Sequence, residues 1–282
     1  MPRTMQIGVT LRNMGPQSTQ EVIAQGVKHA EGLGFESAWI TDHIAIPPDD
    51  AEGSGGRYLD TLTTLAWMAA KTERIKVASG VLILPYRSPL PTAKQVATIQ
   101  ELSGNRLLLG VGIGWMDPEF RALGLDRHSR GITSDETLEF LHRCFENDVV
   151  SANDQTFLFK PRPTRPPILI GGRAPYALKR AVAFGDGWLP MAKRPEQIEQ
   201  DVLLYRQMTE AAGKAPGSVS VMTHLPVEQD ERQARTWLTE YRTLGVERLV
   251  CSVGYETFDE YRLKLDQLSA FLATEGIEGL NS

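Results

Sequence analysis

The chain has 282 residues, of which 41% are hydrophobic and 23% charged, a composition typical of a folded globular protein and not of a disordered or fibrous one. Thirty Lys and Arg against 35 Asp and Glu give a net charge of −5 without a basic cluster, so we expect neither a nucleic-acid nor an anionic-membrane partner. The N-terminus lacks the apolar stretch of a signal peptide, and no apolar run is long enough to span a membrane. The two cysteines, Cys144 and Cys251, are too few and too distant for a disulfide scaffold or a zinc ribbon. We therefore expect a reduced, cytoplasmic protein that acts on small molecules.

Short apolar runs alternate along the chain with longer segments of helical spacing. Strands are predicted at residues 6–11, 37–40, 76–82, 106–111, 168–170, 187–189, 218–225 and 248–252. Helices are predicted at residues 19–33, 59–71, 90–102, 134–146 (with Ser134 as N-cap), 175–185, 195–212, 231–244 and 258–274. A segment at 149–167, rich in proline, is predicted to be an insertion, with a hairpin as its suggested form. Repeated βα units predict a parallel sheet, and uniformly apolar strands offer no edge strand. We therefore predict a TIM (β/α)8 barrel, one domain over residues 1–282 with loop insertions at the C-terminal face of the barrel.

The residues just after each strand are candidates for the active site, because barrel enzymes place their chemistry at the C-terminal ends of the strands. This criterion selects Arg12, Asn13, Thr41, Asp42, His43, Ser79, Gly80, Gly112, Gly114, Trp115, Gly171, Gly172, Arg173, Met191, Lys193, Thr223, His224, Gly254 and Tyr255.

The glycines at 110, 112 and 114 do not form a dinucleotide-binding fingerprint, because Trp115 stands where G-x-G-x-x-G needs glycine and the strand is not the first of a βαβ unit. Glycines here would let a planar ligand approach the barrel mouth closely. The structural alternative is a tight turn out of the strand.

Gly171, Gly172 and Arg173 stand directly before a predicted helix, whose free amides and dipole favour a phosphate. Lys193 could add a second cation. The alternative is an ordinary turn with a solvated arginine and a surface lysine.

Asp42-His43 combines a carboxylate with a side chain that titrates near neutrality, a pair suited to acid–base chemistry at a strand end. An Asp capping a local turn beside an unconnected His is the structural alternative. None of the histidines has the spacing of a metal site.

Six segments in order resemble the luciferase-like monooxygenase superfamily, and within it the branch of probable coenzyme F420-dependent oxidoreductases. They are Trp39-Ile-Thr-Asp42-His43, Thr72-Glu-Arg-Ile-Lys-Val, Gly80 to Pro89, Leu102 to Trp115, Pro167 to Gly172 and Gly185-Asp-Gly-Trp-Leu-Pro190. The similarity runs from about residue 5 to about residue 270.

The resemblance implies a barrel enzyme that binds a deazaflavin, or FMN, at the mouth. It implies that Asp42 and His43 lie at the redox centre and that a non-prolyl cis peptide falls at Ser79-Gly80, behind the ring. It also implies that Gly171, Gly172 and Arg173 bind the cofactor phosphate. Trp115 replaces the glutamate that serves the family's sugar-phosphate dehydrogenases as proton donor, and it would offer an apolar wall or serve only in packing.

Our hypothesis is hydride transfer between coenzyme F420 and a small organic substrate, with His43 as proton donor or orienting group and Asp42 fixing its tautomer. An FMN-dependent monooxygenase on the same fold is the main alternative. A non-catalytic flavin-binding protein and a redox-free lyase or isomerase are further alternatives. Substrate specificity is expected in the loops at 44–57 and 116–131, and the family's habit of dimerising makes a homodimer possible.

Overall fold

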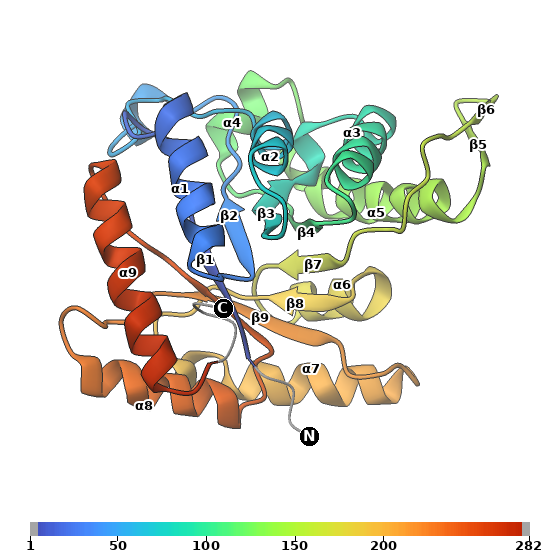
Figure 1. Cartoon of the computed structure of the whole chain (residues 1–282). Coiled ribbons are helices and arrows are strands. Elements are labelled where there is room, and N and C mark those ends of the chain that lie inside the picture. The colour runs from blue at the N-terminus through green and yellow to red at the C-terminus, as the bar shows by residue number, and fades with distance from the viewer. Residues whose placement is uncertain (1–4, 278–282) are drawn as a thin grey trace.

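The computed structural model describes residues 5–277, within which eight parallel strands close into a barrel (Figure 1). The strands are β1 (Gln6–Thr10), β2 (Ser37–Ile40), β3 (Lys76–Ile83), β4 (Leu107–Gly112), β7 (Ile168–Gly171), β8 (Gly187–Leu189), β9 (Ser218–Thr223) and β10 (Arg248–Cys251). Each pairs with the next along the chain, and β10 pairs back with β1. The predicted TIM barrel is thereby confirmed, while its outer bounds at residues 1 and 282 lie outside the described residues.

Helices surround the barrel and connect consecutive strands (Figure 1). The long ones are α1 (Gln20–Gly32), α2 (Thr61–Ala70), α3 (Pro89–Leu102), α5 (Arg130–Glu146), α6 (Tyr176–Phe184), α7 (Glu199–Ala211), α8 (Glu231–Thr243) and α9 (Phe258–Thr274). Short helical segments lie in the connections: η1 (Pro48–Asp50), η2 (Leu84–Tyr86), α4 (Asp117–Ala122), η3 (Arg127–Ser129) and η4 (Pro195–Gln197).

The connection between β4 and β7 is more ordered than the sequence suggests. It contains α4 and η3, and α5 follows η3 directly, so that Ser134 is not the N-cap of α5 as predicted. The Ser134 hydroxyl instead donates to the carbonyl of Arg130, 2.7 Å away, one turn back in the same helix. This bond satisfies the hydroxyl within a helix, which explains why serine is tolerated there.

The insertion after α5 is a two-stranded antiparallel hairpin, β5 (Val149–Ala152) and β6 (Gln155–Leu158), as expected. Its two turn residues, Asn153 and Asp154, both have positive φ, the conformation of the turn that suits a tight hairpin. Figure 1 shows the hairpin standing away from the barrel.

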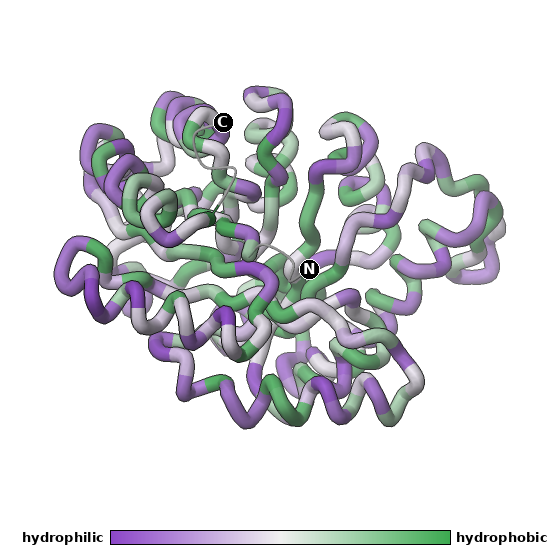
Figure 2. The backbone as a smooth tube through the Cα atoms, turned by 60° about the horizontal axis from the view of Figure 1, so that its bottom comes forward, coloured by the Kyte–Doolittle hydropathy of each residue, from purple (hydrophilic) through white to green (hydrophobic). Residues whose placement is uncertain are grey.

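Apolar side chains fill the barrel interior and form a second, larger core between strands and helices. The interior cluster consists of Trp39, Ala78, Leu108, Leu169, Leu189, Met222 and Val250. Figure 2 shows the same division along the backbone, with hydrophobic stretches in the strands and hydrophilic stretches on the outer helices. The interior is therefore a packed core, and a ligand has room only at its ends.

An ion-pair cluster closes the N-terminal end of the barrel. Glu36, which precedes β2, accepts two hydrogen bonds of 2.9 Å from Arg248 on β10 and one of 2.8 Å from Lys76 on β3. Burial alone would raise the pKa of Glu36, but the two cations outweigh it and hold the pKa at about 2. This cluster lies at the end of the barrel opposite the candidate site, where it serves stability.

Within residues 5–277, no helix has the length and apolar character required to cross a bilayer. The same residues contain no group of three or more His, Cys, Asp or Glu side chains placed to hold a metal ion.

Candidate functional site

His43, just after β2, is the titratable group at the mouth with the clearest set of contacts. Its Nδ1 lies 2.8 Å from Oε2 of Glu119, and its side chain is 16% exposed. The ring is flanked edge-on by Tyr58, at 5.0 Å between centroids, and by Trp115, at 6.4 Å. Glu119 therefore holds the imidazole by a hydrogen bond at Nδ1, and the two aromatic rings pack around it.

Glu119 of α4 is a fully buried carboxylate that the sequence analysis did not select. Besides His43, the carboxylate accepts hydrogen bonds from the Tyr86 hydroxyl at 2.9 Å, from the Ala45 amide at 2.9 Å and from the Ile44 amide. Burial would raise its pKa, but these donors together hold the pKa at about 2, so the group is ionised near neutrality.

Asp42 does not contact His43, so the prediction that Asp42 fixes the tautomer of His43 is wrong in its geometry. The Asp42 carboxylate pairs with both terminal nitrogens of Arg87, at 2.6 and 2.8 Å. It also accepts from the Thr61 hydroxyl and the Ile83 amide, each at 2.8 Å. Four donors saturate this buried side chain, so Asp42 joins β2 to β3, α2 and the segment that enters α3.

A non-prolyl cis peptide lies in β3 as the resemblance implies, but at Gly80–Val81 and not at Ser79-Gly80. The register between β3 and β4 shifts between Ser79 and Leu82. Ser79 itself is buried, still pairs regularly with β4, and donates its hydroxyl to the carbonyl of Gly110 at 2.8 Å. The bulge therefore begins after Ser79, and Val81 is its outermost side chain.

Glycines around the bulge are required by the protein's own packing. A Cβ on Gly112 would lie 2.5 Å from Val81 Cγ2, and a Cβ on Gly171 would lie 2.6 Å from Val81 Cγ1. A Cβ on Gly80 would lie 2.9 Å from the terminal methyl of Met222. Val81 and Met222 therefore fill the space beside these three glycines, and the expectation that Gly112 lets a planar ligand approach closely needs correction.

Val81 forms an apolar floor for the mouth. It is half-buried and packs on the interior cluster, between Gly112 of β4 and Gly171 of β7. Gly114, with a φ of +75°, then turns the chain so that Trp115 follows with 64% of its surface exposed. The mouth thus has an apolar floor and one exposed aromatic wall.

The turn before α6 carries unpaired positive charge. Gly172 has a φ of +122°, and its carbonyl accepts from the Trp188 indole at 3.0 Å. Arg173 and, after β8, Lys193 are exposed, and their side chains make no hydrogen bond or ion pair with residues 5–277. Both cations are free to meet an anion from outside the chain.

Other strand-end residues mainly join the loops to one another. Asn13 is buried and bonds to Thr41 and Leu59, and the Tyr255 hydroxyl accepts from the Arg12 amide at 2.9 Å. Arg12 also donates to the carbonyls of Gly53 and Tyr255, so it ties the 44–57 loop to the loop after β10. Met191 is 82% exposed.

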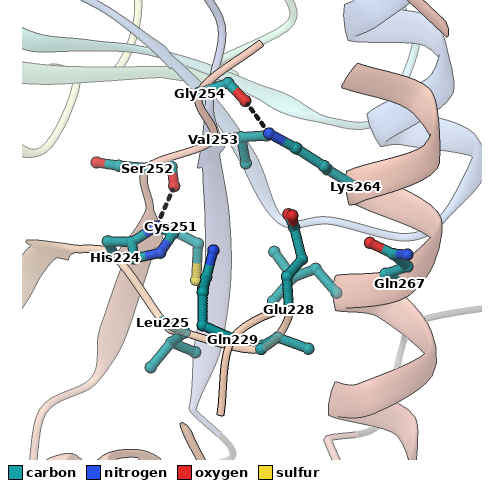
Figure 3. A pocket seen from close by; sticks show the side chains of 12 residues that line it. His224, Leu225, Glu228, Gln229, Cys251, Ser252, Val253, Gly254, Lys264 and Gln267 are labelled. Atoms are coloured by element: carbon teal, nitrogen blue, oxygen red, sulfur yellow. Dashed lines mark hydrogen bonds between the residues drawn. The ribbon is translucent and has the colours of Figure 1, made fainter. Parts of the chain in front are cut away.

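A pocket of about 260 Å³ lies beside the mouth, between the loops after β9 and β10 and helix α9 (Figure 3). His224 lines it, with Nδ1 3.2 Å from the carbonyl of Ser252, and Lys264 donates to the carbonyl of Gly254 at 2.7 Å. Lys264 is also paired with Glu260, and Glu228 faces the same space. Cations and carboxylates are therefore mixed here, and the pocket shows no preference for an anion.

Comparison with known proteins gives one family over nearly the whole described chain. Residues 5–273 match the family model described as luciferase-like monooxygenase. A 5,10-methylenetetrahydromethanopterin reductase from Archaeoglobus fulgidus is 30% identical over 216 residues, which cover 74% of this chain and 61% of the reductase.

Solved structures show the same fold at lower identity. The monooxygenase RslO1 from Streptomyces bottropensis superimposes with a TM-score of 0.81 at 20% identity, over 96% of this chain and all of that one. An F420-dependent secondary alcohol dehydrogenase, in complex with an F420–acetone adduct, superimposes with a TM-score of 0.76 at 15% identity, over 95% of this chain and 99% of that one.

Proposed function

Because the chain belongs to the luciferase-like monooxygenase family, we propose that it is an oxidoreductase that binds coenzyme F420 at the barrel mouth and transfers a hydride to or from a small organic substrate. The reductase relative and the F420-dependent dehydrogenase of the same fold support this reading. The monooxygenase of the same fold keeps an FMN-dependent monooxygenase as the second candidate.

The observation that carries the proposal is the bulge at Val81. Glycines at 112 and 171 let β4 and β7 close around this side chain, so Val81 offers an apolar patch on top of the interior cluster. A tricyclic deazaflavin or flavin ring has the shape and polarity to stack on such a patch. His43, from the connection after β2, and Trp115, from the connection after β4, would then lie at the side of the ring.

Free cations beyond β7 and β8 suit the charged part of such a cofactor. Arg173 stands just before the N-terminus of α6, where backbone amides and the helix dipole favour a phosphate. Lys193 follows the adjacent strand β8. These two side chains would offset the negative charge of the chain locally.

When bound, the deazaflavin supplies the hydride chemistry. The protein's own contribution would be to support the ring on Val81, to wall the substrate with Trp115, and to take up or release a proton at Nε2 of His43. This nitrogen is bound by none of residues 5–277, so it can exchange a proton with a substrate at the mouth.

Titration of the purified protein with F420 and, separately, with FMN tests the proposal. We expect F420 to bind with the higher affinity and to be oxidised or reduced in the presence of a substrate. Retention of FMN in place of F420 would establish the monooxygenase alternative. Tight binding without turnover across a substrate panel would indicate a non-catalytic flavin-binding protein, and binding of neither cofactor would point to a redox-free barrel enzyme.

Replacement of His43 by Ala separates catalysis from binding. We expect turnover to fall by about 100-fold or more, the usual contribution of a general acid or base, while the affinity for the cofactor changes little. Unchanged turnover in a folded variant would remove His43 from the mechanism.

A further inference from the structure

Glu119 is linked to His43 in a way that determines where the imidazole carries its proton. An ionised carboxylate can only accept hydrogen bonds. Its Oε2 lies 2.8 Å from Nδ1 of His43, so the hydrogen between these atoms belongs to the imidazole. The low pKa of Glu119, about 2, keeps the carboxylate in this accepting form.

The remaining ring nitrogen of His43, Nε2, is then the one without a hydrogen-bond partner among residues 5–277. The rings of Tyr58 and Trp115 pack on the imidazole at steep angles, in T-shaped contacts. With Nδ1 occupied by Glu119, a substrate at the mouth can meet His43 only through Nε2.

We propose that Glu119 is a positioning residue that fixes His43 in the tautomer protonated at Nδ1 and presents a bare Nε2 to the barrel mouth. The use of Nε2 in turnover rests on the proposed function. The tautomer itself does not, because it follows from contacts within the chain.

The arrangement of donors around Glu119 gives the proposal a sharp test. Oε1 accepts from the amides of Ile44 and Ala45, which can only donate. In a Glu119→Gln variant the amide oxygen must therefore face these two amides, and the NH₂ group must face His43 and Tyr86. The Tyr86 hydroxyl can turn and accept, but Nδ1 of His43 can accept only by losing its hydrogen. The variant should thus move the proton from Nδ1 to Nε2.

Several charged or titratable groups within residues 5–277 surround this pair. Tyr58, Tyr86, Asp42 and Arg87 are nearest, and Arg12 and Asp60 lie beyond them, where Arg12 acts on Tyr58 and Asp60 pairs with Arg87. Asp42 and Arg87 neutralise each other, and burial together with Glu119 raises the pKa of both tyrosines, so neither tyrosine ionises near neutrality. Glu119 is therefore the group that decides the tautomer.

Long-range ¹H–¹⁵N correlation on protein labelled with ¹⁵N-histidine measures the tautomer directly, because protonated and bare ring nitrogens have well-separated shifts. The chain has five histidines, and the signals lost in a His43→Gln variant assign those of His43. The spectra are recorded well above the ordinary histidine pKa of about 6.5. We expect an Nδ1–H tautomer in the wild type and an Nε2–H tautomer in Glu119→Gln.

Two further variants are controls. Asp266→Asn makes the same change at the partner of His29, where Nε2 and the carboxylate are 2.7 Å apart, and should leave His43 unchanged. Tyr86→Phe removes another donor to the Glu119 carboxylate without removing the charge, and should keep the Nδ1–H tautomer.

An Nε2–H tautomer in the wild type or in Tyr86→Phe would overturn the proposal, as would a folded Glu119→Gln variant that keeps Nδ1–H. The wild-type and Tyr86→Phe spectra decide the matter even if Glu119→Gln fails to fold. Enzyme loaded with cofactor gives a second measurement, in which Glu119→Gln should lower kcat by about 100-fold or more and leave KM little changed. Failure to bind F420 would refute the proposed function alone, because the tautomer is measured without it.

Discussion

The Asp42–Arg87 pair allows a strong prediction, because every acceptor site of the Asp42 carboxylate is used. Oδ1 accepts from Thr61 and Arg87, and Oδ2 accepts from Ile83 and Arg87. In an Asp42→Asn variant the NH₂ group must therefore oppose an Arg87 nitrogen in either orientation. One orientation also places it against the Ile83 amide, which cannot turn away.

The expected loss of stability follows from the hydrogen bonds that Asp42 accepts from Arg87 and from its neighbouring donor on the same oxygen, because an NH₂ group in that place makes these two contacts repulsive or weak. Bonds to charged groups contribute about 1.5–3 kcal/mol each, and removing one partner of a buried ion pair costs about 3–5 kcal/mol. Arg87 keeps one charged partner, Asp60 at 3.1 Å, which offsets part of the loss. We expect the free energy of unfolding to fall by about 3 kcal/mol, and the melting temperature by roughly 6–12 °C.

Urea unfolding followed by circular dichroism measures this difference, and titration with cofactor at low temperature measures binding by the folded protein. Asp60→Asn is the matched control, because it removes a half-exposed partner of the same arginine while asparagine remains a good N-cap for α2. The control should cost less than about 1 kcal/mol. Wild-type stability in Asp42→Asn, together with lost turnover, would refute the structural role of Asp42 and would indicate a catalytic one.

Three further predictions concern the opposite end of the barrel, acid pH and the floor of the mouth. Glu36→Gln should lower the free energy of unfolding by about 3 kcal/mol, since it breaks the ion pair with Arg248. Cofactor affinity should stay unchanged, and a large change in affinity would contradict the separation of this end of the barrel from the mouth. Glu36 and Glu119 both have pKa values lowered from 4.5 to about 2, so their contribution to stability should be complete above pH 4.5 and should be lost as the pH falls toward 2. Thermal melts across this range measure the effect, and a melting temperature independent of pH would show that the two carboxylates contribute nothing. Val81→Asp should weaken binding of F420 at least about 10-fold, because a charge replaces the apolar floor, and unchanged affinity in titrations would place the ring elsewhere.

Much of the fold could be predicted from the sequence, because its signals are local. Buried parallel strands are continuous apolar runs, and the helices between them have clear starts and stops, as at Thr19, where the side chain caps α1, and at Gly185, which ends α6. The predicted start of α5 is wrong because η3 leads directly into the helix, and the N-cap residue Ser129 makes no capping side-chain hydrogen bond.

The candidate site was predicted in position but only partly in its contacts. His43, Trp115, Arg173 and Lys193 lie at the mouth as the strand-end rule requires. The assignments of these residues to catalysis and cofactor binding stay predictions. Gly112 and Gly171 are special positions because the Val81 side chain lies against them, and the position of Val81 depends on the bulge in β3. A pattern within one strand cannot reveal what the neighbouring strand inserts.

The pairing of Asp42 with His43 shows why adjacency in sequence misled the interpretation. Neighbouring side chains in an extended segment point to opposite sides, so residues i and i+1 seldom form a hydrogen-bonded pair. Asp42 accordingly forms hydrogen bonds with Arg87 and Thr61, while His43 forms one with Glu119, which lies 76 positions along the chain.

The sequence signal for Glu119 is the run Asp117-Pro118-Glu119, where a proline lies at the start of a short helix and a carboxylate follows in its first turn. Acidic residues are common in the first turn of a helix, because the helix dipole stabilises them there. Glu119 differs from Asp117 only in its burial and its four hydrogen-bond donors, whereas Asp117 is half-exposed and pairs with Arg121. The sequence therefore does not distinguish Glu119, which positions His43, from Asp117, which is an ordinary acidic residue of the first helical turn.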